Sequence, residues 1–143
     1  MKKQFLLFTT IISFFSCEKP CQEASTGPPS FAVELIDKTT LNNVFTSGIF
    51  LPSQLQVVDN DNNILSFKLD SENNRNVVSI TPAWQGGVFK IFIKLNNTVT
   101  IPIFVFNEAV SDRCNSNVFH RNIQVEGFDF TKNNQVGYYQ IKI

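Results

Sequence analysis

Residues 88–106 read VFKIFIKLNNTVTIPIFVF, and this stretch decides the fold. In Val88–Leu95, apolar side chains occupy one set of alternate positions and lysines fall among the others, as in a strand with one buried face. Asn96-Asn97 follows, and asparagine favours tight turns because its side chain bonds nearby backbone and tolerates positive φ. A second apolar run, Thr98–Phe106, comes directly after the turn. The stretch therefore predicts a β-hairpin.

Outward from this hairpin, short apolar runs alternate with turns rich in Asn, Asp and Gly, and no segment has the 3.6-residue period of a long helix. The spacing of about ten residues predicts seven or eight strands in an all-β, antiparallel β-sandwich, with a barrel as the weaker alternative. The further strands that we expect are Phe31–Ile36, Leu55–Val58, Ile64–Leu69, Val77–Ile80, Val118–Val125 and Tyr139–Ile143, with a short apolar piece at Val44–Phe45.

Two local features refine this prediction. Ser71–Asn76 is wholly polar and predicts a loop. Pro102 has no backbone N–H, which predicts that its strand lies at a sheet edge or is bulged at that residue. Phe128 and Phe130 are expected to lead into a turn at Lys132–Asn134.

The start of the chain, MKKQFLLFTTIISFFSCEKPC, has the layout of a secretory signal peptide. Two lysines precede an apolar run, which ends at a small residue, Ser16, and a cysteine, Cys17. The run from Phe5 to Phe15 would span only about 16 Å as a helix, about half of a hydrocarbon core. An uncleaved membrane helix is therefore the weakest alternative, and ordinary secretion with Cys17 merely nearby is the other.

The segment Phe14-Phe15-Ser16-Cys17 resembles the cleavage site of bacterial lipoproteins of the Bacteroidetes type. The resemblance implies cleavage before Cys17, acylation of that cysteine, and attachment to the cell envelope, with the outer membrane as the expected location. The expected organisation is a signal peptide at 1–16, a lipidated Cys17 and tether at 17–30, and a β-sandwich domain at 31–143.

Composition limits the classes of partner. The chain has 12 Lys and Arg against 12 Asp and Glu, and loss of Lys2 and Lys3 with the signal peptide leaves 10 against 12, a net charge of −2. Such a balance provides no basic excess for phosphate backbones, so we expect no nucleic-acid binding. Cys21 and Cys114 would remain beside the lipidated cysteine, and they form either a disulfide or two free thiols.

The stretch 31–69 resembles the start of transthyretin-like and carboxypeptidase-regulatory-like sandwiches. The residues that carry this likeness are Val33, Asp37, Thr39 or Thr40, Val57 and Asp59. The resemblance implies a transthyretin-like or Ig-like sandwich and brings no ligand with it.

Catalytic signals are weak. His120 is the single histidine, in an expected strand where it shares a face with Val118 and Asn122, and a lone histidine is more often structural than catalytic. No GxSxG, HExxH, CxxC or phosphate-binding loop occurs. We therefore expect no enzyme and no cofactor.

The run Asp59–Asn63 invites comparison with a calcium-binding loop. Asp59, Asp61 and Asn63 fill positions 1, 3 and 5 of such a loop, but Ile64 stands where the turn needs glycine. A hairpin turn explains the same residues, so calcium is a weak alternative and no metal is expected.

Trp84 precedes two glycines and is either a core residue or, if exposed, a contact for a protein or a sugar. The sequence thus predicts a lipid-anchored envelope module that binds a protein or glycan partner without catalysis. The alternative is an inhibitor or immunity-type protein that blocks an enzyme, with the expected loop at Ser111–Ser116 as the plug.

Overall fold

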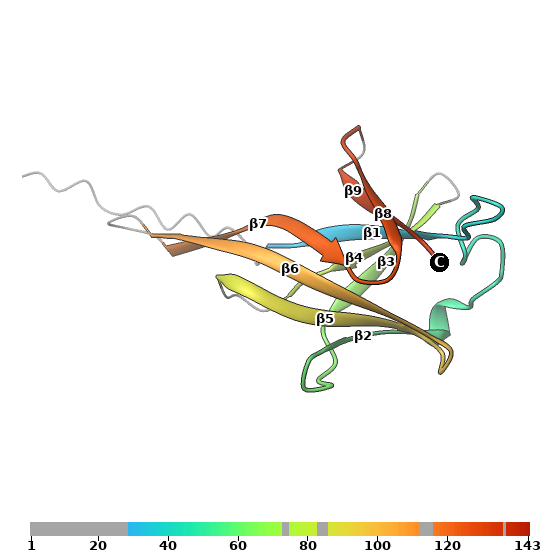
Figure 1. Ribbon diagram of the computed structural model, residues 1–143, viewed down its shortest axis with the longest axis horizontal. Helices are drawn as coiled ribbons and strands as arrows, with labels where there is room; N and C mark the ends of the chain where they lie inside the picture. Colours follow the sequence, from blue (N-terminus) through green and yellow to red (C-terminus); the bar gives the residue numbers. More distant parts are fainter. Residues whose placement is uncertain (1–28, 73–74, 83–85, 112–115, 136) are drawn as a thin grey trace, which may run out of the picture.

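A computed structural model describes residues 29–72, 75–82, 86–111, 116–135 and 137–143 (Figure 1). Within these ranges nine strands form two sheets that face each other. Sheet A has the order β3-β4-β1-β9-β8, and sheet B has the order β2-β5-β6-β7. The elements are β1 (Phe31–Ile36), the 3₁₀ turn η1 (Pro52–Gln54), β2 (Leu55–Asp59), β3 (Phe67–Glu72), β4 (Arg75–Ile80), β5 (Gly87–Leu95), β6 (Val99–Ser111), β7 (Ser116–Val125), β8 (Asp129–Asn133) and β9 (Tyr138–Lys142).

The core lies between the sheets and is built by alternate residues of each strand. Leu35 and Ile141 of sheet A and Ile93 and Ile103 of sheet B are all 0% exposed and belong to one cluster. Each such side chain contributes about 1.5–3 kcal/mol through removal from water. The predicted β-sandwich is confirmed.

The hairpin at 88–106 is confirmed in detail. Leu95 pairs with Val99, and the turn between them is set by Asn96, which has φ of 50° and accepts a 2.7 Å hydrogen bond from the Thr98 N–H on its Oδ1. The predicted alternation holds as well, because Ile91 and Leu95 are buried while Lys94 is only partly covered.

The sandwich departs from a purely antiparallel design at one pair of strands. The first strand, β1, and the last, β9, run parallel, with Val33 beside Tyr139. One strand, β8, is additional to the seven or eight that the sequence predicts. It includes Lys132 and Asn133, where the sequence predicts a turn, and it pairs Phe130 with Ile141 of β9. Val44 and Phe45 are buried in a turn and not in a strand. The Asn43 side chain stabilises this turn, because its Oδ1 accepts a hydrogen bond from the Phe45 N–H.

The prediction of a loop at Ser71–Asn76 is wrong for the four of these residues that the structure describes, Ser71, Glu72, Arg75 and Asn76. β3 and β4 continue into it and pair Ser71 with Asn76, whose side chains hydrogen-bond to each other. Polar residues thus form strand where both faces of the hairpin end reach solvent. The strand expected at Ile64–Leu69 begins only at Phe67, as β3. Ile64 makes an isolated bridge to Val58 and is 77% exposed.

The prediction for Pro102 is also wrong, since β6 lies between β5 and β7 and its bulge falls after Phe106. The Pro102 C=O accepts a hydrogen bond from the Glu126 N–H, so the side of Pro102 that lacks a donor faces β7. β7 ends at Val125, opposite Ile103. The missing N–H therefore falls just past the end of β7, where it removes no hydrogen bond between the two strands, and an interior strand tolerates this proline for that reason.

Candidate functional site

Exposed apolar side chains gather on the outer face of sheet B, the face turned away from the core. Val88 is 60% exposed, Phe119 is 42% exposed and Val110 is 41% exposed. The strand register places them on one surface, because Val88 pairs with Phe106 and the next outward pair along β6 and β7 is Glu108 with Phe119. Exposed apolar groups that cluster in this way are typical of binding surfaces.

Two cations lie over aromatic rings of this outer face. Lys90 Nζ is 4.8 Å from the ring centroid of Phe104 and 3.0 Å from Glu126 Oε2. The Arg121 guanidinium is 5.8 Å from the Phe119 ring. Cation–π contacts of this kind contribute about 0.5–1 kcal/mol at exposed sites.

Arg121 is also fixed by an ion pair with Glu108 on the neighbouring strand. The surface therefore combines exposed apolar groups with charged groups that already have partners. A ligand that covers it would bury aromatic surface without leaving those charges unpaired.

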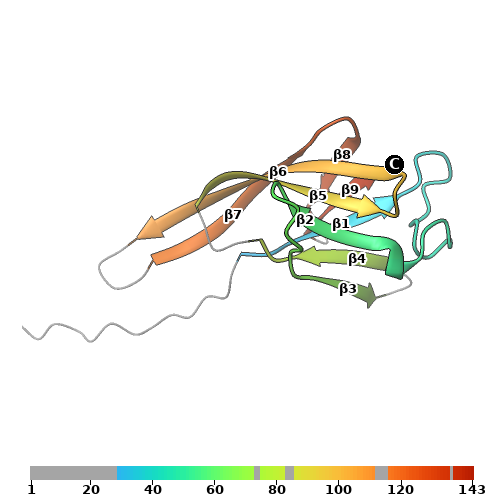
Figure 2. The same cartoon turned by 90° about the horizontal axis from the view of Figure 1, so that it is seen from below.

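This surface continues onto a two-stranded arm, defined as Asn107–Ser111 of β6 with Ser116–His120 of β7. The first residue of β5, Gly87, pairs with Asn107, so beyond that point β6 and β7 pair only with each other among the described residues. Figures 1 and 2 show the arm extending past the end of β5, away from the rest of the sandwich. β6 is 13 residues long for this reason.

A bulge at Arg121 sets which side chains of the arm face inward. Asn107 pairs with His120 and Phe106 pairs with Asn122, which leaves Arg121 as the extra residue. Each bulge shifts the in–out alternation by one position. Val118 and Ile123, on either side of the bulge, are both buried, and His120 faces inward with them. Asn122 is more exposed, yet its Oδ1 reaches the same Tyr139 hydroxyl as His120 Nε2.

His120 anchors the base of the arm to sheet A. Its ring stacks on Phe31 with 5.0 Å between centroids, and its Nε2 lies 3.3 Å from Tyr139 Oη. Tyr139 Oη donates to Asn122 Oδ1, so it accepts from Nε2–H. Nδ1 is then a buried lone pair, and it has no hydrogen-bond partner among the described residues.

The surroundings of His120 disfavour the charged form of its ring. Burial lowers the pKa of His120 below its ordinary 6.5, and the nearby Lys132 charge lowers it further. Burial also raises the pKa of Tyr139. No hydrogen bond or ion pair joins His120 to a carboxylate within the described residues, so the ring has the environment of a packing residue.

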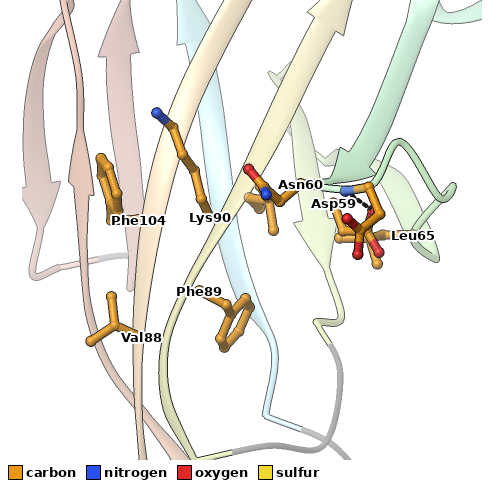
Figure 3. A pocket seen from close by; sticks show the side chains of 9 residues that line it. Asp59, Asn60, Leu65, Val88, Phe89, Lys90 and Phe104 are labelled. Atoms are coloured by element: carbon orange, nitrogen blue, oxygen red, sulfur yellow. Dashed lines mark hydrogen bonds between the residues drawn. The ribbon is translucent and has the colours of Figure 1, made fainter.

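A groove of about 600 Å³ runs beside β5 where β2 has ended (Figure 3). Its side chains come from the end of β2 (Asp59), the following loop (Asn60, Leu65), β5 (Val88, Phe89, Lys90) and β6 (Phe104).

The open edge of β5 lies in this groove. The Asn96 N–H donates to the Gln54 C=O, so the even-numbered residues of β5 direct their backbone groups toward β2. β2 stops opposite Ile91, and among the described residues no strand lies beside Val88 and Lys90 on that side. Their N–H and C=O groups could therefore pair with an added strand.

The calcium candidates belong to the turn at one end of the groove. Asp59 Oδ1 accepts 2.8 Å hydrogen bonds from the N–H groups of Asp61 and Asn63, and Asp59 Oδ2 accepts one from the Asn63 side chain. These bonds lower the pKa of Asp59. The carboxylate thus closes its own turn, and the residues described here contain no group of three His, Cys, Asp or Glu side chains arranged for a metal ion.

Four residues singled out from the sequence, Cys17, Cys21, Trp84 and Cys114, lie outside the described residues. The predictions of lipidation, of a disulfide and of a tryptophan contact therefore stand as predictions. Within the described part of the chain, no helix has the length and apolar character needed to cross a membrane. No known protein family, curated protein or solved structure matches the chain.

Proposed function

We propose that this chain is a lipid-anchored binding module of the bacterial cell envelope, without a catalytic role, that docks a partner protein on the outer face of sheet B. The observation that carries the proposal is the continuous surface from Val88 to the arm, where apolar side chains are exposed beside Phe119 and the paired Arg121. Aromatic residues and arginine at the centre of a patch are the groups that most often dominate protein interfaces.

The anchor is supported by the signal sequence and Cys17. An acyl chain contributes about 0.8 kcal/mol for each buried CH₂, so two or three chains hold a protein on a membrane without help from its folded domain. The domain's surface is then available for a partner. The open edge at Val88 and Lys90 offers that partner backbone pairing in addition to side-chain contacts.

The anchor is tested by the intact mass of the chain extracted from membranes of its native host. We expect residues 17–143 plus diacylglyceryl and acyl groups. An increase of two hydrogens on reduction would reveal the Cys21–Cys114 disulfide. An unmodified mass would refute the anchor and leave the docking surface to be tested alone.

The docking surface is tested by photo-crosslinking in intact cells. A photoreactive amino acid replaces Phe119 in one variant and Leu51 in the control; Leu51 is also exposed, at 58%, but lies outside the outer face of sheet B. We expect a discrete crosslinked protein from position 119 and none from position 51. Equal crosslinking from both positions, or none from position 119, contradicts the proposal.

A second candidate is an inhibitor or immunity-type protein that blocks one enzyme. The observation that favours it is the shape of the arm, since among the described residues its two strands pair only with each other and form a projection that a cleft could accept. If the crosslinked partner is an enzyme, replacement of the arm by a two-residue turn should abolish inhibition. An accessory module would leave the partner's activity unchanged on binding.

A further inference from the structure

A polar pocket of about 420 Å³ lies on the outer face of sheet A, beside the turn that follows β1. That turn is at the end of the molecule opposite to the arm (Figure 2). The pocket is lined by residues of β1, β4, β9 and the turn: Glu34, Ile36, Leu41, Asn42, Asn43, Thr46, Ser47, Arg75 and Gln140. Its volume falls within the range of small-molecule sites.

The floor of the pocket is a buried carboxylate. Glu34 lies between Val33 and Leu35, which face the core, so its side chain points to the opposite face, yet it is only 3% exposed. Gln140 Nε2 donates a 2.7 Å hydrogen bond to Glu34 Oε2, and no ion pair within the described residues neutralises the carboxylate. A buried carboxylate is costly unless donors surround it, and an ionised one accepts at about four positions.

Arg75 supplies donors at the same pocket. Its Nη1 donates to Tyr138 Oη at 2.7 Å, which fixes the guanidinium over the sheet. A guanidinium has five N–H groups, so several remain for a ligand. Glu34 and Arg75 together give the pocket no net charge, and its other polar lining is amide or hydroxyl.

The wall of the pocket is held in place by Asn43, which is 7% exposed. Its Oδ1 accepts the N–H groups of Phe45 and Thr46 at 3.0 and 3.1 Å. Its Nδ2 donates to the Asn76 C=O at 2.8 Å and so ties the turn to β4. The turn is therefore fixed without a ligand, which reduces the entropy lost on binding.

The rim of the pocket carries a strained residue. Leu41 has φ of 59° and is 61% exposed. The left-handed region is unfavourable for a bulky side chain, and strain of this kind is found mainly where function requires it. Here it holds an aliphatic group at the mouth of a polar pocket.

We propose that this pocket binds the end of a neutral glycan chain. Each sugar hydroxyl both donates and accepts, so one ring can donate to Glu34 and accept from Arg75. The absence of net charge matches a neutral ligand, and Leu41 provides an apolar surface for the C–H face of the ring. The site is separate from the outer face of sheet B and does not depend on the function proposed for that face.

Saturation-transfer NMR on the full-length chain in detergent tests this site. The probes are maltotriose, mannotriose and tri-N-acetylchitotriose, with glycine and alanine as zwitterionic competitors. We expect transfer to at least one trisaccharide and none to the amino acids. Binding of amino acids alone, or of none of the five compounds, overturns the proposal.

Variants connect binding to the pocket. Glu34→Gln preserves shape but removes the charge, and Arg75→Ala removes the donors from an exposed position; each should weaken trisaccharide binding at least tenfold. Asp129→Asn on β8, outside the lining of the pocket, is the matched carboxylate-to-amide control and should leave the binding unchanged. Binding that survives both pocket variants contradicts the proposal.

Leu41→Gly separates a role in binding from a role in folding. Glycine accepts the left-handed backbone without strain, so the midpoint of thermal unfolding should not fall, while trisaccharide affinity should fall several-fold. Unchanged affinity in this variant would show that the strained leucine serves no ligand and would overturn its part in the site.

Discussion

β6 passes through two environments, and the contrast between them separates the part of the molecule that makes it stable from the part that is available to a partner. In the sandwich, Ile101, Ile103 and Val105 of β6 are 0% exposed because sheet A covers them. In the arm, β7 is the only strand paired with β6 among the described residues, and the inward-facing Ala109 and the outward-facing Val110 are both exposed, Val110 to 41%. One continuous strand thus contributes first to the core and then to a surface.

The difference shows that the length of a strand depends on pairing with its neighbour in the sheet, whereas the burial of its side chains depends on a second, facing sheet. Pairing with β7 extends β6 to Ser111, whereas burial along β6 ends at Asn107, and on β7 it reaches only to Val118, which is 7% exposed. Exposed apolar groups beyond that point add little to stability, so their position at the surface is better explained by binding.

The largest expected effect tests this division directly. Ile103→Ala removes a fully buried side chain and should lower the free energy of unfolding by about 2–5 kcal/mol. Val110→Ala, on the same strand, should change it by no more than about 0.5 kcal/mol. Urea unfolding followed by fluorescence measures both. Similar losses in the two variants would mean that the arm is part of the folding core.

The hairpin, the sandwich and most strand positions could be predicted from the sequence because they follow from alternation and turn chemistry. The parallel pairing of β1 with β9 could not, since it depends on which distant strands become neighbours. The bulge at Arg121 was equally hidden, because a single extra residue leaves no mark in composition. Prediction therefore failed where long-range pairing decided the outcome.

The same limit applies to the sites. Asp59 is a calcium candidate in the sequence, but in the structure its carboxylate accepts hydrogen bonds from its own turn. Glu34 was passed over, although a lone acidic residue inside the apolar run FAVELI was a visible signal. What the sequence could not supply was the approach of Arg75 and Gln140, which come from strands far along the chain.

A smaller effect is expected where the chain crosses the base of the arm. A Cβ added at Gly86 would lie 2.7 Å from Ala109 Cβ and 3.1 Å from the Ala109 backbone nitrogen. Gly86→Ala should therefore destabilise the protein by about 1–3 kcal/mol through overpacking. Urea unfolding measures the loss.

Ala109→Gly in the same chain is the internal control for that steric explanation. It removes the closest atom while the backbone contact remains, so the double variant should recover part of the stability. If the stability losses of Gly86→Ala and Ala109→Gly are additive in the double variant, the clash with Ala109 is not the cause of the loss in Gly86→Ala.

The smallest effect concerns the histidine that joins arm and sandwich. Because the pKa of His120 is lowered in the folded chain, the unfolded chain binds its proton more readily. The contribution of His120 to stability is therefore complete above pH 6.5 and is lost as the pH falls through 6.5 toward the lowered pKa. Asp37, Asp59 and Asp70, whose pKa values lie below 3.8, affect stability only at more acidic pH.

Urea unfolding between pH 7.5 and 5 should accordingly show falling stability for the native chain and a flatter profile for His120→Phe, which keeps an aromatic ring against Phe31. Lys132→Met should give an intermediate slope, since burial is the larger cause of the shift and the lysine charge the lesser one. If all three profiles coincide, His120 titrates alike in the folded and unfolded chains. The ring would then not be held between arm and sandwich, and the arm would be less firmly joined to the core than its contacts imply.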